Sequence, residues 1–240
     1  MDESPDSYAM KPVGVVHSCF REKFGIPRQP GLVPAAEATI ELLPPADQPE
    51  AVRGLDGFSH LWVVFVFHAC PDGKWRPTVR PPRLGGNERV GVFASRSPFR
   101  PNRTGLSLVK LEKVVADATG VRLRVSGADL LDGTPVLDLK PYIPYAESVP
   151  EASAGFASTA PESRLTVRFS TAAEAAIAAR SDLPRLHELI EQLLVLDPRP
   201  ATRREDNRIF GFRLYDFDVR WRVIGTEAEV VELGTGEAPK

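Results

Sequence analysis

Short, strand-like runs follow one another through the first 145 residues, and this succession limits the possible folds more than any other feature. Val121, Leu123 and Val125 alternate with polar neighbours, as expected of a half-buried strand. Pro/Gly-rich loops separate the runs, and no long helical pattern interrupts them. The sequence therefore predicts a β-barrel or a β-sandwich rather than βαβ units. Strands are expected at residues 13–18, 39–43, 61–67, 89–94, 106–115, 121–126 and 136–140.

The run LWVVFVF at residues 61–67 is continuously apolar, which predicts a strand buried on both faces. It is far too short to span a bilayer. The first ten residues, MDESPDSYAM, are acidic and lack the apolar segment of a secretion signal. Two cysteines, Cys19 and Cys70, cannot form a disulfide framework. Together these features predict a cytoplasmic protein with no membrane segment.

The composition changes after Tyr145, and residues 146–163 are small, polar and Pro-containing, as in a linker. We therefore expect a β-barrel domain at residues 9–150 and a small α+β domain at residues 161–240. The second domain should contain a strand at 165–169, an Ala-rich helix opened by a capping box of Thr171 and Glu174, a second amphipathic helix, and a hairpin or bulged strand pair within 210–224. The apolar face of the second helix comprises Leu186, Leu189, Ile190, Leu193 and Leu194.

The stretch SRSPFRPNRTG at residues 95–105 places three arginines around Phe99, with Pro98 and Pro101 between them. Proline fixes φ and removes a backbone donor, so this stretch predicts a stiff loop, which loses less entropy when it binds a ligand. It ends a basic segment, because eight Lys and Arg residues lie between Lys74 and Arg103 against one acid, Glu88. On a chain with a net charge of −2, this segment indicates a phosphate-binding surface; the alternative is a solvated charged face.

Two further loops carry polar residues. DGTPVLDLKPYIPY at residues 132–145 begins with a strong turn signal, and Asp138 and Lys140 would share one face of the strand that follows. The alternative is a hairpin turn with a surface salt bridge. PRQPGL at residues 27–32 is a third Pro/Gly loop. His60 and His68 flank the apolar strand, where a structural role is more common than a catalytic one.

The sequence lacks the motifs of several large enzyme classes. No GxGxxG follows a strand and opens a helix, and no GxxxxGK[ST] is present, which argues against a Rossmann-type cofactor site and a P-loop. The four histidines show no metal-ligand spacing, so no metal site is expected.

Several of these stretches occur in the same order in one known family. PRQPGLV, RGLDGFSHLWVVFVFH, WRPTVRPPRLGGNERVGVFASRSPFRPNRTGLSLV, DLLDGTPVLDLKPYIPYAES and DPRPA…YDFDVRWRV resemble the TrmO family, also called TsaA-like, from about Val13 to Val223. The resemblance implies a small, non-Rossmann β-barrel that binds S-adenosylmethionine near the interface of a homodimer. It also implies methylation of N6 of N6-threonylcarbamoyladenosine at position 37 in the anticodon loop of threonine tRNA, which improves decoding.

The resemblance also implies residue roles. We expect cofactor contacts from the first loop, from the end of the apolar strand, from the arginine-rich loop and from the turn, and RNA contacts from the basic segment. One departure is that Arg103 stands where many members have proline, which adds a possible phosphate contact. The cofactor residues are Gln29, Pro30, Gly31, His68, Ala69, Arg96, Leu106, Asp132, Gly133, Thr134 and Pro135; the RNA residues are Arg83, Phe99, Arg100, Asn102, Arg103 and Lys140.

A sulfonium cofactor carries its own leaving group, so the enzyme mainly has to align the reacting atoms. For a general base near N6, Asp138 ranks first and Tyr142 second. Two other functions compete with the methyltransferase. One is a non-catalytic RNA-binding β module, which does not need the DGTP turn or PRQPG. The other is an S-adenosylmethionine-dependent enzyme that acts on a small molecule, which leaves the basic segment unexplained.

Overall fold

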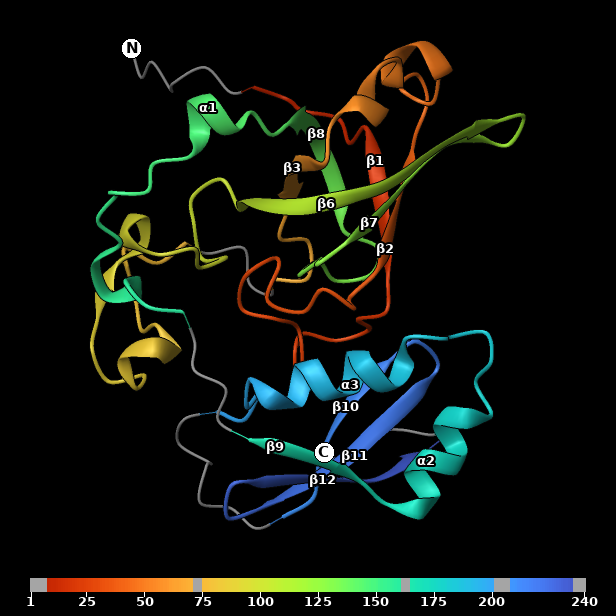
Figure 1. The fold of residues 1–240 in the computed structure, drawn as a ribbon. Helices are drawn as coiled ribbons and strands as arrows, with labels where there is room; N and C mark the ends of the chain where they lie inside the picture. The colour runs from red at the N-terminus through yellow and green to blue at the C-terminus, as the bar shows by residue number, and fades with distance from the viewer. Residues whose placement is uncertain (1–7, 71–74, 161–164, 201–207, 235–240) are drawn as a thin grey trace.

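The computed structural model describes residues 8–70, 75–160, 165–200 and 208–234. Six strands form a closed antiparallel barrel in the order β1-β2-β7-β6-β3-β8, which confirms the predicted β-rich first half (Figure 1). The strands are β1 (Gly14–Ser18), β2 (Ala38–Leu42), β3 (His60–Val66), β6 (Thr104–Asp117), β7 (Gly120–Ser126) and β8 (Pro135–Pro141).

In strand β3, the side chains alternate between the interior of the barrel and its outer face. Leu61, Val63 and Phe65 point inward and are buried, whereas Trp62 and Val64 between them are only half-buried. The expectation that this strand is buried on both faces is therefore wrong for the single chain. Antiparallel barrel strands have one face in the core and one outside, and the outward residues of β3 happen to be apolar too.

The strand order brings three long connections to one rim of the barrel. Because neighbouring strands are antiparallel, β1, β3 and β7 end at the rim where β2, β6 and β8 begin. The connections at this rim are residues 19–37, 67–103 and 127–134. We call it the loop rim.

The 67–103 connection contains little regular structure. Its strands β4 (Thr78–Val79) and β5 (Val90–Gly91) pair with each other and not with the barrel. The strand expected at residues 89–94 is therefore mostly wrong, because Val92–Ala94 turn into a 3-10 helix. Arg76 N–H donates to the carbonyl of Phe99, which folds the connection back on itself.

The C-terminal part is an α+β unit, as expected. The four-stranded sheet has the order β10-β11-β12-β9, and β9 runs parallel to β12. Figure 1 shows α3 between this sheet and the barrel. The predicted strand pair is confirmed as the β10–β11 hairpin. The elements are β9 (Thr166–Phe169), α2 (Thr171–Ala178), α3 (Leu186–Val195), β10 (Phe210–Leu214), β11 (Phe217–Ile224) and β12 (Glu227–Gly234).

The helix starts and the expected linker differ in detail from the sequence analysis. Ser170, not Thr171, caps α2, because its side chain accepts a hydrogen bond from Ala173 N–H at 3.1 Å. The expected capping box of Thr171 and Glu174 is therefore wrong by one position. The described part of the expected linker contains the end of the short helix α1 (Pro144–Glu147) and a 3-10 turn at Gly155–Ala157.

The core consists of two clusters. One fills the barrel. The other fills the space around α3 and the second sheet, and it includes Cys19, Phe20, Val33, Ala35 and Ala36 from the β1–β2 connection. The first connection of the loop rim thus joins two strands of the barrel, but its buried side chains pack in the core of the C-terminal unit.

Candidate functional site

The loop rim gathers the residues that the sequence analysis assigned to the cofactor. Gln29, Pro30 and Gly31 lie in the first connection, His68, Ala69 and Arg96 in the second, and the DGTP turn in the third. Leu106 lies two residues past the start of β6. Strands that are distant in the sequence but adjacent in the barrel therefore bring all of these stretches to one rim.

Direct contacts join the first connection to the other two. Arg96 Nη1 donates to Gln29 Oε1 at 2.5 Å. Gly31 N–H donates to the carbonyl of Gly127 at 2.8 Å. Gly127 has a φ of +68°, and a Cβ on it would lie 3.2 Å from the Cα of Gly31, so the two backbones meet without room for a side chain.

A carboxylate that the sequence analysis did not single out lies beside these contacts. Asp129 Oδ1 accepts a hydrogen bond from the buried Ser107 hydroxyl at 2.6 Å. Burial raises the pKa of Asp129 to about 6, although the Ser107 hydrogen bond and the charge of Arg96 both lower it. A carboxyl group with a raised pKa between binding loops is typical of a functional site. No sequence pattern predicts this role for Asp129, because its burial depends on how the connections of the loop rim pack together.

The DGTP turn faces the barrel. Asp132 binds the guanidinium of Arg21 and accepts from Ser18 N–H at 2.9 Å. The backbone N–H groups of Asp132, Gly133 and Thr134 donate to carbonyl oxygens within the chain. The backbone donors of this turn are therefore already used within the chain. Gly133 has a φ of +75°, which explains the glycine.

The end of β3 is tied to the arginine-rich loop. Phe67 N–H donates to the carbonyl of Arg103 at 2.9 Å, and Arg103 Nη1 donates to the carbonyl of Cys70 at 3.3 Å. His68 and Ala69 therefore lie beside the loop that carries Arg96. Arg103 thus joins the two ends of the second connection.

The arginines of residues 75–103 share one electrostatic feature. Within the described part of the chain, none of them forms an ion pair with a carboxylate, whereas most arginines elsewhere do. Arg83 binds the Thr159 hydroxyl at 3.0 Å, and Arg89 binds the Thr78 hydroxyl at 3.0 Å. Their positive charge is held in place but not neutralised. Lys74 lies outside the described residues.

Aromatic rings accompany these arginines, in an arrangement that the sequence did not predict. The guanidinium of Arg76 lies 4.5 Å from the centroid of Phe99. The guanidinium of Arg100 lies 5.6 Å from the centroid of Phe93, whose side chain is 75% exposed. A hollow of about 240 Å³ adjoins Phe93. Its lining consists of Phe93, Arg100, Pro101, Asn102 and Thr104.

The expected general bases lie away from the loop rim in the single chain. Asp138 pairs with Lys140 at 2.9 Å, on the outside of β8. Tyr142 is at the opposite rim, where its N–H donates to the carbonyl of His60 at 3.0 Å. Its ring packs edge-on against Trp62, with 6.1 Å between the centroids.

Two kinds of feature are absent from the part of the chain that the structure describes. Residues 8–70, 75–160, 165–200 and 208–234 contain no group of three or more His, Cys, Asp or Glu side chains placed to hold a metal ion. Within the same ranges, no helix is long and apolar enough to cross a membrane.

Comparison with known families gives two matches. Residues 15–148 match the tRNA-methyltransferase O N-terminal domain, and residues 162–236 match the TrmO C-terminal domain.

Individual proteins give the same result. The tRNA (adenine(37)-N6)-methyltransferase of Escherichia coli is 49% identical over 230 residues, which cover 95% of this chain and 98% of that protein. A Pseudomonas aeruginosa protein named as an S-adenosylmethionine-dependent methyltransferase is 50% identical over 218 residues, or 90% of this chain and 92% of its own. A crystal structure of TrmO from P. aeruginosa superposes with a TM-score of 0.81 at 42% identity, and covers 98% of this chain and 100% of that one.

Proposed function

Because this chain belongs to the tRNA-methyltransferase O family, we propose that it transfers a methyl group from S-adenosylmethionine to N6 of adenosine 37 in tRNA. In finer terms, the methyl acceptor is N6-threonylcarbamoyladenosine in the anticodon loop of threonine tRNA. The observation that carries the proposal is the loop rim, where three separate connections bring a fixed guanidinium, a buried carboxylate and close backbone approaches together.

The residues of the rim fit the cofactor. S-adenosylmethionine has an amino acid end with a carboxylate and an ammonium group, and Arg96 and Asp129 offer the opposite charges. Gln29, Pro30, Gly31, His68, Ala69, Leu106 and residues 132–135 supply the remaining contacts. When bound, the cofactor supplies an electrophilic methyl group on a sulfonium that carries its own leaving group. The task of this chain is then to orient the acceptor nitrogen and to exclude water.

The basic surface fits the RNA. Uncompensated arginines attract phosphates without losing an internal ion pair, so their charge is available to a nucleic acid. RNA loops present unstacked bases that aromatic rings can stack on, and Phe93 beside the hollow offers such a ring. We propose that Arg83, Phe99, Arg100, Asn102, Arg103 and Lys140 contact the tRNA, together with Phe93.

The proton on N6 needs an acceptor. Asp138 and Tyr142 remain proposals for this role, and Asp129 is a further one. Asp129 lies at the loop rim, and a pKa of about 6 leaves most of it ionised at neutral pH.

We propose that the protein works as a homodimer in the cytoplasm. The outer face of β6 and β3 is apolar near the loop rim: Leu106, Leu108, Trp62 and Val64 point outward, and Leu106 is 50% exposed. An apolar patch on a barrel wall favours association with another protein surface. Leu106 lies both on this face and near the loop rim, which supports a cofactor site close to the interface.

The test is in vitro methylation with radiolabelled S-adenosylmethionine. The substrates are threonine tRNA with and without threonylcarbamoyladenosine. We expect label only in the modified tRNA. Label in neither tRNA, with cofactor binding intact, would move the assignment to another methyl acceptor. A lack of cofactor binding would favour an RNA-binding module without catalysis.

A further inference from the structure

The first connection of the loop rim is held at both ends by the C-terminal unit. Its beginning lies along the β10–β11 hairpin: Tyr215 N–H donates to the carbonyl of Cys19 at 2.8 Å, and Phe20 pairs with Leu214 in an isolated bridge. Arg213 N–H donates to Glu22 Oε1 at 3.0 Å. The hairpin thus provides an edge that Phe20 joins through a single antiparallel bridge.

Side-chain packing reinforces this first anchor. Phe20 is 1% exposed and lies in the same cluster as Phe212 and Trp221. A Cβ on Gly25 would lie 3.0 Å from the ring of Phe212, so glycine is needed for the approach, and its φ of +92° adds a second reason. Residues 19–25 therefore fold as part of the C-terminal core.

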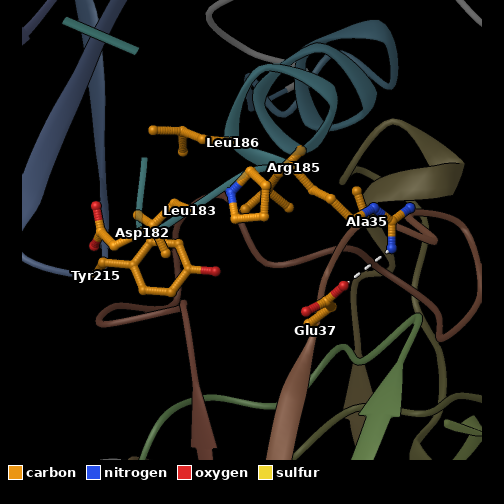
Figure 2. Close-up of a pocket in the computed structure, with 9 residues that line it drawn as sticks. Ala35, Glu37, Asp182, Leu183, Arg185, Leu186 and Tyr215 are labelled. Atoms are coloured by element: carbon orange, nitrogen blue, oxygen red, sulfur yellow. Dashed lines mark hydrogen bonds and ion pairs between the residues drawn. The ribbon is translucent and has the colours of Figure 1, made fainter. Parts of the chain in front are cut away.

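The end of the connection is anchored by α3. Ala35 N–H donates to Gln192 Oε1 at 2.9 Å, and Arg185 Nη1 pairs with Glu37 Oε1 at 3.2 Å (Figure 2). Arg185, which directly precedes α3, and Gln192 within it are linked through Glu188, which accepts from Gln192 at 2.9 Å and pairs with Arg185 at 2.9 Å. Glu37 and Arg185 belong to the lining of a cavity of about 70 Å³. Figure 2 shows the ion pair between them and, across this cavity, Tyr215.

Between the two anchors lie Gln29 and Gly31, which reach the other two connections of the rim. A loop whose ends are fixed has fewer conformations to lose when it binds a ligand. We propose that the C-terminal unit is a positioning device for the cofactor: its hairpin and α3 hold residues 26–32 in the shape that binds S-adenosylmethionine. Gln192 is the positioning residue on the helix side. This inference rests on the proposed function.

The test uses the full chain and the variant Gln192→Met, which keeps the side-chain volume but removes the acceptor for Ala35 N–H. Arg168→Ala is the control, because Arg168 forms ion pairs with Glu227 and Glu229 on the sheet edge opposite β10. Hydrogen exchange of residues 26–36 is measured without ligand. Calorimetry measures the Kd of S-adenosylhomocysteine, and methylation assays give KM for tRNA.

For Gln192→Met we expect faster exchange of residues 26–36 and a roughly fivefold weaker Kd, the value of one net hydrogen bond. The KM for tRNA should stay within about twofold, and the control should match the wild type. An unchanged Kd despite faster exchange would overturn the inference. A higher KM for tRNA with an unchanged Kd would instead make the C-terminal unit an RNA-binding element.

Arg185→Gln is the second variant, since its exposed side chain can be changed without opening the core. It removes the pair with Glu37, and the same loss of S-adenosylhomocysteine affinity is expected. Failure of the wild type to bind S-adenosylhomocysteine would contradict the proposed function itself, which separates that outcome from failure of the positioning role.

Discussion

Arg96 Nη1 and Gln29 Oε1 lie 2.5 Å apart, although 67 residues separate them in the sequence. The contact joins the arginine-rich connection to a loop whose ends are buried in the C-terminal unit. One hydrogen bond thereby connects the basic surface, the barrel and the C-terminal unit at the place where we propose the cofactor binds.

Replacement of Arg96 should weaken cofactor binding. Arg96→Lys keeps the charge but loses the planar fork and the bond to Gln29. A charge-assisted hydrogen bond contributes about 1.5–3 kcal/mol, so the Kd for S-adenosylmethionine, measured by calorimetry, should rise at least about tenfold. Arg89→Lys, in the same basic segment but bonded to Thr78, should leave this Kd unchanged. Equal effects of the two variants would contradict a specific role for Arg96.

The pH dependence of the reaction tests Asp129. If its carboxylate accepts the proton or binds the cofactor, kcat/KM should rise with pH and level off above about 6, the pKa of this group. Asp129→Asn should lose this acid limb and about 100-fold or more in rate. Asp138→Asn should keep the limb. The opposite pattern would make Asp138 the proton acceptor.

Asp129 should also make the stability of the folded protein depend on pH. Folding raises the pKa of Asp129 from 3.8 to about 6, so the native state favours its protonated form. Its contribution to stability is complete below about pH 4 and is lost as the pH rises through about 6. Thermal unfolding between pH 4 and 7 should therefore show Asp129→Asn gaining stability relative to the wild type as the pH increases. A constant difference across this range would refute the raised pKa.

Phe93 should matter for RNA and not for the cofactor. Base stacking on an aromatic ring contributes about 1–3 kcal/mol, so Phe93→Ala should weaken tRNA binding about tenfold in a filter-binding assay. Arg100→Gln should reduce the slope of log K against log salt by about one. Phe58→Ala removes another exposed ring, in the β2–β3 connection at the other rim, and should have no effect. If Phe93→Ala binds tRNA as tightly as the wild type, the hollow beside Phe93 is not part of the RNA-binding surface.

The outer face of the barrel predicts the assembly state. Leu108→Glu places a charge among the apolar residues of β3 and β6, and should give a monomer in sedimentation velocity measurements. Thr39→Glu, on the outside of β2, is the control and should leave the assembly unchanged. A wild-type protein that sediments as a monomer would contradict the dimer.

Much of the fold could be predicted from the sequence because it depends on local signals. Alternation of apolar and polar residues predicted β7, and the apolar face of Leu186 to Leu194 predicted α3. The Asp-Gly turn at residues 132–133 was also expected and is present, with a positive φ at Gly133. These features follow from steric preferences and side-chain periods over a few residues.

Packing decided what local signals could not. The capping box was misplaced because Ser170 and Thr171 are both good caps, and the hydrogen bond of Ser170 to Ala173 distinguishes them only in the structure. The strand at residues 89–94 became mostly a turn. Strand β3 was interpreted as buried on both faces, because a run of apolar residues does not tell which neighbours cover each face.

The sequence by itself determined the family, the barrel and the loops that carry the candidate site. Only the tertiary structure showed that Asp129 belongs to this site, that Phe93 lies beside a hollow, and that the Gln29 loop is anchored by the C-terminal unit. The physical reason is the distance along the sequence between the residues that make each contact. Secondary structure and turns follow from contacts between near neighbours, whereas the burial of a carboxyl group or the clamping of a loop depends on chain segments that meet only after the barrel closes.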